Sequence, residues 1–502
     1  MTFSKEDIEI LNNHVWSIDD DIYVIYNLPP EVVAVLFAYV SRSPASFRKN
    51  LLKLIKSKEL DMGDLITSFK NKGLDYDQAK EKAKQFHERW VVGYGHSSVA
   101  EHAVASIAME NVSILATKVI EDNRLASYTE KSTRYQVFDR NTYYKPKNLK
   151  GEAKEIYEKT CNMLFDTYCD IMPKMVEYMK KKHPKKEGEN DRLYESVTKA
   201  RACDVARYLL PASTLTNLGM TVNARSIEYG VTKMLSSPLS EMKAIGEGVR
   251  RETTKVIPTL IKYARENEYM EQTNKVMEKL AHHDIKPLKR EGHDNVILVH
   301  HDPEADNKLV ASILYRYSDH KYEDIFHKVE HMTRTEKEEV LDEYLKRMGK
   351  HDRPMRELEH VNYTFDILVD YGAFRDIQRH RMCTQTNQDL TTKHGYDIPP
   401  EIKDAGFEKD FVKCMEAADN VFKTMSKEYP KEAQYVVPLA YKKRVLISMN
   451  LRDLYNFVKL RSGPEGHISY RKIAWDMYDA TKNATPLVAR HMKVDKTIGP
   501  SR

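Results

Sequence analysis

Apolar residues recur three and four positions apart over most of the chain, which predicts long amphipathic helices. The clearest examples are "AKEIYEKTCNMLFDTYCDIMPKMVEYMKKK", from Ala153, and "EDIFHKVEHMTRTEKEEVLDEYLKRM", from Glu323. Two shorter runs, "DIYVIYNL" from Asp21 and "NVILVHHD" from Asn295, are rich in β-formers and predict strands that each precede a helical pattern. We therefore expect a helix-rich α+β fold in which strand, helices, an arginine-rich element and long helices occur in that order twice.

Short motifs recur along the chain at two stable offsets. The first pairs, His102 with His360 and Arg124 with Arg381, are separated by 258 and 257 residues. The later pairs, in "LLPAS" and "VVPLA" and in "TVNARS" and "SMNLRD", are Pro211 with Pro438 and Asn223 with Asn450, both 227 residues apart. Two constant offsets separated by one jump indicate a duplication with a single insertion.

The insertion of about thirty residues falls between Arg134 and Pro211. A polar segment with Pro and Gly, "HHDIKPLKREGHDN", lies between the halves and is typical of a linker. We expect a first repeat over residues 1–281, a linker over 282–294, and a second repeat over 295–502. The two repeats would form an intramolecular pseudo-dimer.

The composition favours a soluble globular protein. The chain has 502 residues, 41% of them hydrophobic and 31% charged, and no apolar run reaches the roughly 18 residues of a membrane span. The start lacks the features of a signal peptide, and five cysteines without CxxC spacing fit reduced thiols. We therefore expect a cytoplasmic location and no membrane partner. A net charge of +5 does not suggest bulk nucleic-acid binding.

Common catalytic signatures are missing from the sequence, which has no GxGxxG after a strand, no GxxxxGKS, no HExxH and no GxSxG. The pairs His282/His283 and His300/His301 have no cysteine or acid cluster beside them, so surface histidines explain them better than a metal site. We expect no metal.

Arginines carry the candidate chemistry. Arg379, His380 and Arg381 stand together after a helical stretch, where they suit a phosphate or an electron-rich ring, although an exposed basic turn explains the triplet better when it is taken alone. Arg452 and Asn456 share a helix face that leads to Arg461. In the first half, Glu130, Ser132 and Arg134 alternate as in an extended segment, which could grip a ribose and phosphate. Half-exposed strands alternate in the same way.

Taken in order, "GHSSVAEH", "SYTEKSTRY", "DVARYLLP" and "TVNARS" resemble the landmarks of the flavin-dependent thymidylate synthases, whose signature is RHRxxSxNExSxRY. The resemblance covers nearly the whole chain, once per half. It implies an α/β unit that assembles as a tetramer, with active sites shared between subunits. It also implies FAD, dUMP, methylenetetrahydrofolate and NADPH as ligands. The activity implied is the reductive methylation of dUMP to dTMP.

The same resemblance implies that each half keeps a different part of one site. The second half would hold FAD and act on the base, and the first half would bind the nucleotide phosphate. The implied flavin residues are Arg379, His380, Arg381, Asn450, Arg452 and Asn456, with His96 and Ser98 of the first half. The implied base-activating residue is Arg461. The implied dUMP residues are Glu130, Ser132, Arg134 and Arg207.

The counterpart positions in the other half have changed. Thr391 and Gln434 replace the phosphate arginines in the second half, and Tyr229 and Met234 replace the counterparts of Asn456 and Arg461 in the first. Complementary losses predict one composite site per chain and a homodimer of tandem chains, equivalent to a four-unit assembly.

Two departures leave alternatives open. Asp376 stands where the family has a Gln near the nucleotide, and Thr129 replaces the signature Asn. The chain could therefore perform the same flavin and folate chemistry on another pyrimidine. It could also be a catalytically silent nucleotide-binding homologue.

Overall fold

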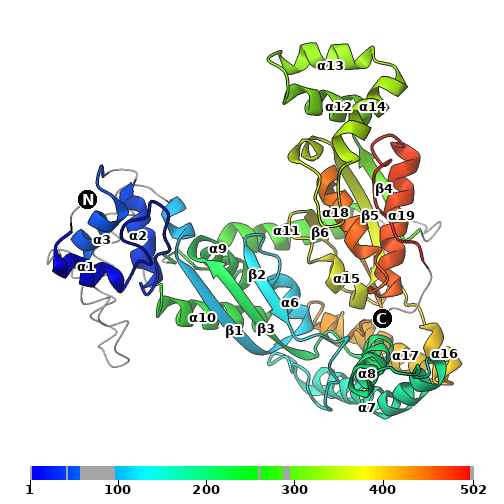
Figure 1. The fold of residues 1–502 in the computed structure, drawn as a ribbon. Helices are drawn as coiled ribbons and strands as arrows, with labels where there is room; N and C mark the ends of the chain where they lie inside the picture. Colours follow the sequence, from blue (N-terminus) through cyan, green and yellow to red (C-terminus); the bar gives the residue numbers. More distant parts are fainter. Residues whose placement is uncertain are drawn as a thin grey trace. The chain divides into compact units, whose positions relative to one another are not determined.

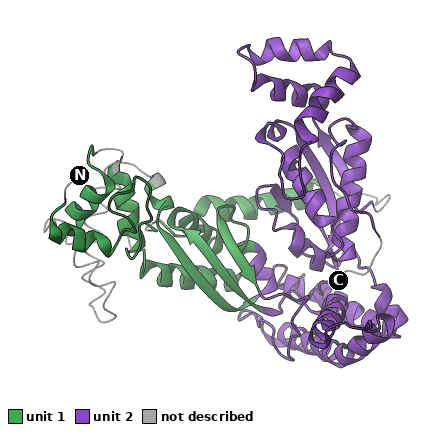
Figure 2. Cartoon of the chain, in the orientation of Figure 1, with its two compact units in different colours: residues 1–112, 119–130, 216–286 green, residues 113–118, 131–215, 287–502 purple. Residues whose placement is uncertain are grey.

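A computed structural model describes residues 3–40, 43–56, 97–257, 260–261, 263–285 and 294–497. The chain divides into two compact units (Figure 2). Unit 1 comprises residues 1–112, 119–130 and 216–286, and unit 2 comprises residues 113–118, 131–215 and 287–502.

Unit 1 contains a three-stranded sheet in the order β1-β3-β2 (Figure 1). Its elements are α1 Lys5–Asn12, α2 Pro30–Val40, α3 Phe47–Lys56, η2 Ser97–Glu101, β1 Val104–Ser113, β2 Ala126–Glu130, β3 Leu215–Asn223, α9 Ala224–Leu235, α10 Ser240–Thr254 and α11 Glu268–Asp284. Strand β2 pairs antiparallel with β3, from Ala126 opposite Val222 to Glu130 opposite Leu218. Buried and exposed side chains alternate along β3, so one face of this sheet is apolar and the other polar.

The strand predicted over Asp21–Leu28 is wrong. Among the described residues, this segment contributes only an isolated bridge between Val15 and Ile25. Ile22 and Val24 are exposed, whereas Tyr23, Ile25 and Leu28 pack into the hydrophobic cluster formed with α1, α2 and α3 and not against a second strand. The β-formers alone were not sufficient to make a strand.

Unit 2 contains a four-stranded antiparallel sheet in the order β4-β5-β7-β6, against which α18 and α19 pack (Figure 1). Its elements are α7 Gly151–Lys182, α8 Asp191–Ala206, η3 Arg207–Leu209, β4 Val296–His301, α12 Ala305–Tyr315, α13 Tyr322–Glu330, α14 Arg334–Leu345, η4 Arg356–His360, β5 Asn362–Asp370, α15 Tyr371–Ile377, β6 Thr384–Asn387, α16 Pro400–Asp404, α17 Glu408–Met425, η5 Glu432–Val436, β7 Lys442–Asn450, α18 Leu451–Arg461 and α19 Ile468–Ala484. The helix α6, Ile114–Ile120, begins in this unit. Strand β4 confirms the strand predicted from Asn295.

The two sheets repeat the same plan. Strands β1, β3 and β2 occur in the same spatial order as β5, β7 and β6, and β3 and β7 are both nine residues long. Each of these last two strands ends at an Asn that caps the next helix. The Asn223 side chain accepts from the Ser226 amide at 2.9 Å, and the Asn450 side chain accepts from the Asp453 amide at 2.8 Å. The offset found in the sequence is therefore reproduced in local structure.

Within unit 2, matching segments of the two halves bond to each other reciprocally. Pro211 and Pro438, which occupy equivalent positions, form an antiparallel bridge. Four backbone hydrogen bonds flank it: Ala212 N to Val437 O (2.9 Å), Leu439 N to Leu210 O (2.9 Å), Ser213 N to Tyr435 O (3.0 Å) and Ala440 N to Tyr208 O (3.2 Å). With the offset of 227 residues, the bond from Leu439 to Leu210 is the counterpart of the bond from Ala212 to Val437. The bond from Ala440 to Tyr208 is in the same way the counterpart of the bond from Ser213 to Tyr435. This exchange is the pattern of an isologous, two-fold contact.

The long helices of the two halves extend this contact. Helix α7 packs against α17, and the two helices begin at equivalent positions, Gly151 and Glu408. Buried residues follow the three- and four-residue spacing along α7, as in Cys161, Leu164, Phe165 and Tyr168. The extra residues of the first half form α8, which packs against α7.

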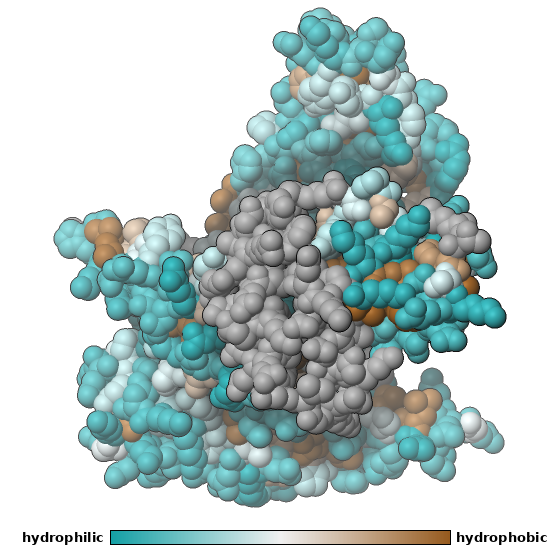
Figure 3. All heavy atoms as spheres, turned by 90° about the vertical axis from the view of Figure 1, so that its left-hand side faces the viewer, coloured by the Kyte–Doolittle hydropathy of each residue, from teal (hydrophilic) through white to brown (hydrophobic). Residues whose placement is uncertain are grey.

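The boundary between the predicted repeats lies partly in helix, because α11 continues to Asp284 and includes His282 and His283. Residues 286–293 of the predicted linker lie outside the described residues. Across the part of the chain that the structure describes, no helix is long and apolar enough to cross a membrane. The coloured residues on the face drawn in Figure 3 are mostly hydrophilic, with small hydrophobic patches between them.

Candidate functional site

Three predicted arginines lie in one buried cluster of unit 2. Arg134 comes from the turn after β2, Arg207 begins η3, and Arg461 is the last residue of α18. The first two belong to the first half of the chain and the third to the second half. The structure therefore brings together the predicted phosphate-binding and base-activating residues.

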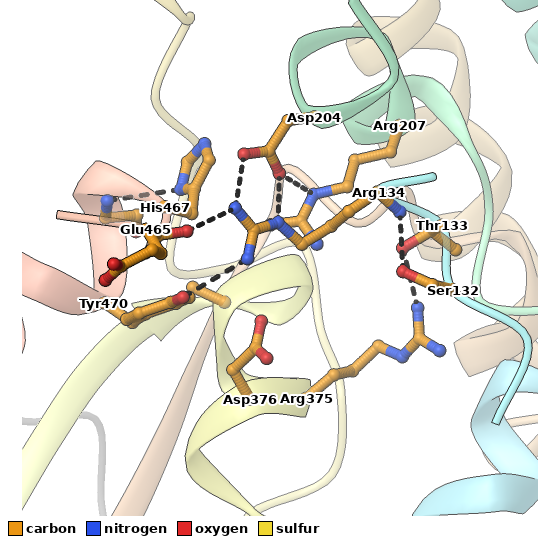
Figure 4. A network of polar contacts seen from close by, with 12 residues as sticks. Ser132, Thr133, Arg134, Asp204, Arg207, Arg375, Asp376, Glu465, His467 and Tyr470 are labelled. Atoms are coloured by element: carbon orange, nitrogen blue, oxygen red, sulfur yellow. Dashed lines mark hydrogen bonds and ion pairs between the residues drawn. The ribbon is translucent and has the colours of Figure 1, made fainter. Parts of the chain in front are cut away.

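Arg134 has a partner for each of its guanidinium nitrogens (Figure 4). Its Nε and Nη2 donate to the two oxygens of Asp204 at 2.9 and 3.0 Å. Its Nη1 donates to the Tyr470 hydroxyl at 3.2 Å, and Nη2 also reaches the Glu465 carbonyl at 3.3 Å. The bidentate carboxylate pairing fixes the guanidinium plane.

Arg207 is the least satisfied cation of the cluster. It is 2% exposed, and its Nε lies 3.3 Å from Asp204 Oδ1. Its Nε and Nη2 are buried without a hydrogen-bond partner among the described residues. A buried guanidinium nitrogen normally has an acceptor, so this fork is suited to an anionic ligand.

Asp204 remains ionised between the two arginines. Burial raises the pKa of this carboxyl, but His467, Arg207 and Arg134 outweigh it and hold the pKa below its ordinary value. The carboxylate therefore holds two like charges close together.

Arg461 is bound to the arginine-rich triplet. Its Nε donates to Nε2 of His380 at 2.8 Å, and its Nη1 lies 3.8 Å from Asp376 Oδ1. Arg379 forms an ion pair with the same Asp376. Burial lowers the pKa of His380 well below its ordinary value, and Arg461, Arg379 and Arg381 lower it further. The imidazole is therefore neutral and accepts through Nε2.

The predicted flavin residues are distributed over two neighbouring elements. The triplet follows the end of α15, with the Arg379 side chain 52% exposed. On α18, Arg452 donates to the Pro354 carbonyl at 2.7 Å and to Glu359 at 2.9 Å. Asn456 lines a cavity of about 340 Å³ whose other walls include Lys350, Arg353, Lys459 and Lys493. Asn450 uses its side-chain oxygen as the helix cap.

Other predicted residues lie elsewhere. His96 and the Ser98 side chain lie outside the described residues. Glu130 is the last residue of β2 in unit 1. The expected extended alternation through Ser132 and Arg134 is wrong, because a turn begins at residue 133. The Ser132 hydroxyl accepts from the Arg134 amide at 3.2 Å and so supports this turn.

Sequence reasoning missed four residues near the cluster: Tyr208, His467, Ser469 and Tyr470. Tyr470 contacts Arg134, and His467 is buried, where desolvation lowers its pKa. The Tyr208 hydroxyl lies 3.3 Å from His467 Nδ1, and Ser469 donates to Asp370. The breaker "SGPEG" before His467, Ser469 and Tyr470 signalled only a loop, and nothing in the sequence showed that the loop returns to Arg134.

Within the described ranges, no group of three or more His, Cys, Asp or Glu side chains could hold a metal ion. All five cysteines are described, and none forms a disulfide.

A family model described as thymidylate synthase complementing protein (Thy1) matches residues 41–259 and 297–487. One match falls in each half of the chain. This result agrees with the duplicated motifs and with the repeated strand order.

The chain is also similar to several individual proteins. It is 35% identical over 488 residues to a UPF0159 protein of Chlamydia pneumoniae, covering 94% of this chain and 91% of that protein. It is 36% identical over 491 residues to a UPF0159 protein of Chlamydia muridarum, and the match covers 95% of this chain and 92% of that protein. Identity to the flavin-dependent thymidylate synthase of Saccharolobus solfataricus is 30% over 203 residues, 39% of this chain and 68% of that protein.

A crystal structure of the flavin-dependent thymidylate synthase of Helicobacter pylori, complexed with FAD and dUMP, is also similar to this chain. The alignment covers 40% of this chain and 100% of the Helicobacter pylori chain. Sequence identity is 21% and the TM-score is 0.30, a value too low to bear on the fold.

Proposed function

Since the chain belongs to the thymidylate synthase complementing protein (Thy1) family, we propose that it is a flavin-dependent enzyme that converts dUMP to dTMP. Methylenetetrahydrofolate and NADPH are the proposed co-substrates. One composite site per chain performs the reaction. The observation that carries this proposal is the cluster of Arg134, Arg207 and Arg461, in which two halves of the chain contribute to one buried site.

Arg207 and Arg134 hold the nucleotide phosphate in this proposal, and Ser132 and Glu130 are the other proposed dUMP residues. The buried Nη2 of Arg207 has no hydrogen-bond partner among the described residues and would donate to a phosphate oxygen, while Nε stays in its ion pair with Asp204. Arg461 faces the base and stabilises negative charge as it develops on the uracil ring. Its hydrogen bond to His380 and its position beside Asp376 orient the guanidinium before substrate arrives.

FAD is the proposed cofactor, and the donor set present fits it. Arg379 and Arg381, with His380, Asn450, Arg452 and Asn456, supply guanidinium and amide groups, and the cavity beside Asn456 has a basic rim. Such groups suit a diphosphate and the polar edge of a ring. His96 and Ser98 complete the proposed set. Once reduced by NADPH, the bound flavin would supply the hydride and relay the one-carbon unit from methylenetetrahydrofolate.

The two halves form an intramolecular pseudo-dimer in this proposal, from a first repeat at 1–281 and a second at 295–502. The reciprocal hydrogen bonds around Pro211 and Pro438 support it, because each bond has its counterpart with the halves exchanged. Two chains then make a homodimer equivalent to a four-unit assembly. The proposed location is the cytoplasm.

The test is dTMP formation by the purified, FAD-loaded protein, with dUMP, methylenetetrahydrofolate and NADPH. Arg461→Ala should lower kcat more than it weakens dUMP binding, because its charge matters most in the transition state. Arg207→Ala should weaken dUMP binding about ten- to a hundredfold, as expected for a lost hydrogen bond to phosphate. The matched control for Arg207→Ala is Gln434→Ala, at the equivalent position in the other half. Equal dUMP affinity in all variants would refute the assignment.

A second candidate function is supported by Asp376. Its buried carboxylate lies beside Arg461 and Arg379, where it would accept a hydrogen bond from an amino group on the base. Flavin and folate chemistry on another pyrimidine nucleotide would then replace the reaction on dUMP. Comparing turnover of dUMP and dCMP distinguishes the two. A silent homologue would turn over neither.

A further inference from the structure

Tyr470 contacts both arginines that the proposed function assigns to opposite ends of the nucleotide. The residue lies in the first turn of α19 and is 4% exposed. Its ring centroid lies 5.9 Å from Cζ of Arg134 and 5.6 Å from Cζ of Arg461. One neutral aromatic ring therefore faces two guanidinium groups at cation–π distance.

The turn before α19 holds this ring in place. A Cβ at Gly466 would lie 2.5 Å from Cε2 of Tyr470, so the ring packs directly on the backbone of residue 466. The preceding carbonyl, that of Glu465, accepts from Arg134 at 3.3 Å. The ring and the turn thus contact Arg134 together (Figure 4).

This arrangement engages four of the five N–H donors of Arg134 and leaves one N–H on Nη1. Asp204 takes Nε and Nη2, and the Tyr470 hydroxyl takes Nη1. A phosphate that binds Arg134 through two nitrogens, the usual bidentate arrangement, must replace one of these partners. The neutral hydroxyl is the partner most readily exchanged, because a guanidinium binds a charged phosphate oxygen more strongly than a phenol.

We propose that Tyr470 is an internal occupant of the nucleotide site and that a pyrimidine nucleoside monophosphate displaces it. The phosphate takes the place of the hydroxyl on Arg134 Nη1 and accepts from the buried Nη2 of Arg207, which has no hydrogen-bond partner among the described residues. The base takes the place of the phenol ring beside Arg461. Before nucleotide binds, the ring keeps both guanidinium groups in position and shields them from other anions. The identity of the ligand rests on the proposed function, whereas displacement of the ring holds for any phosphate monoester.

Two variants test the displacement by different routes. Tyr470→Phe keeps the ring but releases Arg134 Nη1. Gly466→Ala pushes the ring away, since the overlap falls on the far end of the Tyr470 side chain and residue 466 has no left-handed backbone to strain. The matched control is Tyr455→Phe, whose equally buried hydroxyl donates to the Val488 carbonyl at 2.6 Å instead of meeting an arginine.

Binding of inorganic phosphate and of dUMP is measured by calorimetry on the full-length, FAD-loaded protein. Tyr470→Phe and Gly466→Ala should each bind phosphate about tenfold more tightly than wild type, the value of one polar contact, and Tyr455→Phe should match wild type. Unchanged or weaker phosphate binding in both test variants would overturn the proposal. If both variants bind phosphate more tightly but dUMP binds no better than phosphate, the occupant role stands and the proposed nucleotide function fails.

Discussion

Arg461 and His380 are joined by a 2.8 Å hydrogen bond from the guanidinium Nε to the imidazole Nε2. They lie 81 residues apart, one at the end of α18 and the other in the triplet after α15. Because Nε2 accepts, the imidazole must carry its proton on Nδ1 and remain neutral. The proposed base-activating residue and the arginine-rich triplet are therefore one unit.

The neutral His380 predicts a pH dependence of stability. Its pKa is lowered in the folded state, mainly by burial, so below about pH 6.5 the unfolded chain binds a proton that the folded chain does not. The free energy of unfolding should fall as the pH drops below this value, by about 1.4 kcal/mol for each unit until the folded-state pKa is reached. His380→Gln keeps an acceptor for Arg461 and should lose part of this slope. Urea unfolding of both proteins between pH 7.5 and 5 measures the difference, and equal slopes would contradict the prediction.

Lys443 predicts a second pH dependence on the alkaline side. Burial, with help from Lys118, lowers its pKa to about 7, and its ammonium donates to the Gln388 carbonyl. Between about pH 7 and 10.5 the unfolded chain holds this proton more tightly than the folded chain. The contribution of Lys443 to stability should therefore increase with pH across this window, by about 1.4 kcal/mol per unit.

The control for this prediction is Lys443→Met, which has a similar length and no charge. In this variant the free energy of unfolding should no longer increase between pH 7 and 10, whatever its value at pH 7. Urea midpoints at four pH values are sufficient to compare the two slopes. A variant that retains the wild-type rise would show that Lys443 titrates normally.

Removing the Arg134 side chain should affect stability as well as ligand binding. Its bidentate pair with Asp204 is buried, with side-chain exposures of 16% and 7%. Arg134→Ala leaves a buried carboxylate short of one partner, although Arg207 remains nearby, and should cost about 3 kcal/mol or somewhat less. Adding Asp204→Asn should restore part of the loss, because the uncompensated charge is removed. Additive losses in this double-mutant cycle would mean that the pair contributes little.

Flavin binding should depend on the second half of the chain. The protein should bind about one FAD per chain by flavin absorbance, because only this half keeps the complete triplet. Arg379→Ala with Arg381→Ala should remove most of the flavin, since guanidinium groups for the cofactor are lost. Arg124→Ala, at the position equivalent to Arg381, should retain it. Two flavins per chain, or loss of flavin in the Arg124 variant, would exclude a single composite site.

Much of the fold followed from the sequence. The offsets measured between motifs reappear as equal strand order in the two sheets and as the matched caps Asn223 and Asn450, because side-chain periodicity and capping are local properties. The strand predicted over Asp21–Leu28 failed because pairing requires a partner that local pattern does not reveal. The turn at residues 133–135 likewise replaced an expected extended segment.

The candidate site was only partly accessible to sequence reasoning. Arg134, Arg207 and Arg461 were recognised from motifs, and the structure places them together. Tyr470 was missed because its contact with Arg134 joins residues 336 positions apart. No periodicity or spacing reports a contact of that range, and its significance depends on Gly466 leaving room for the ring.

The central claim is that Arg207 and Arg461 of the same chain serve one site. Co-expression of two differently tagged chains, one carrying Arg207→Ala and the other Arg461→Ala, tests it most directly. Mixed assemblies, purified through both tags, are assayed for dTMP formation beside wild type and each single variant. If the site is built within one chain, every site in the mixture has one lesion and activity stays at the level of the single variants. Recovery to about half of wild-type activity would show that the two arginines come from different chains, as in a symmetric assembly with shared sites, and would contradict the account.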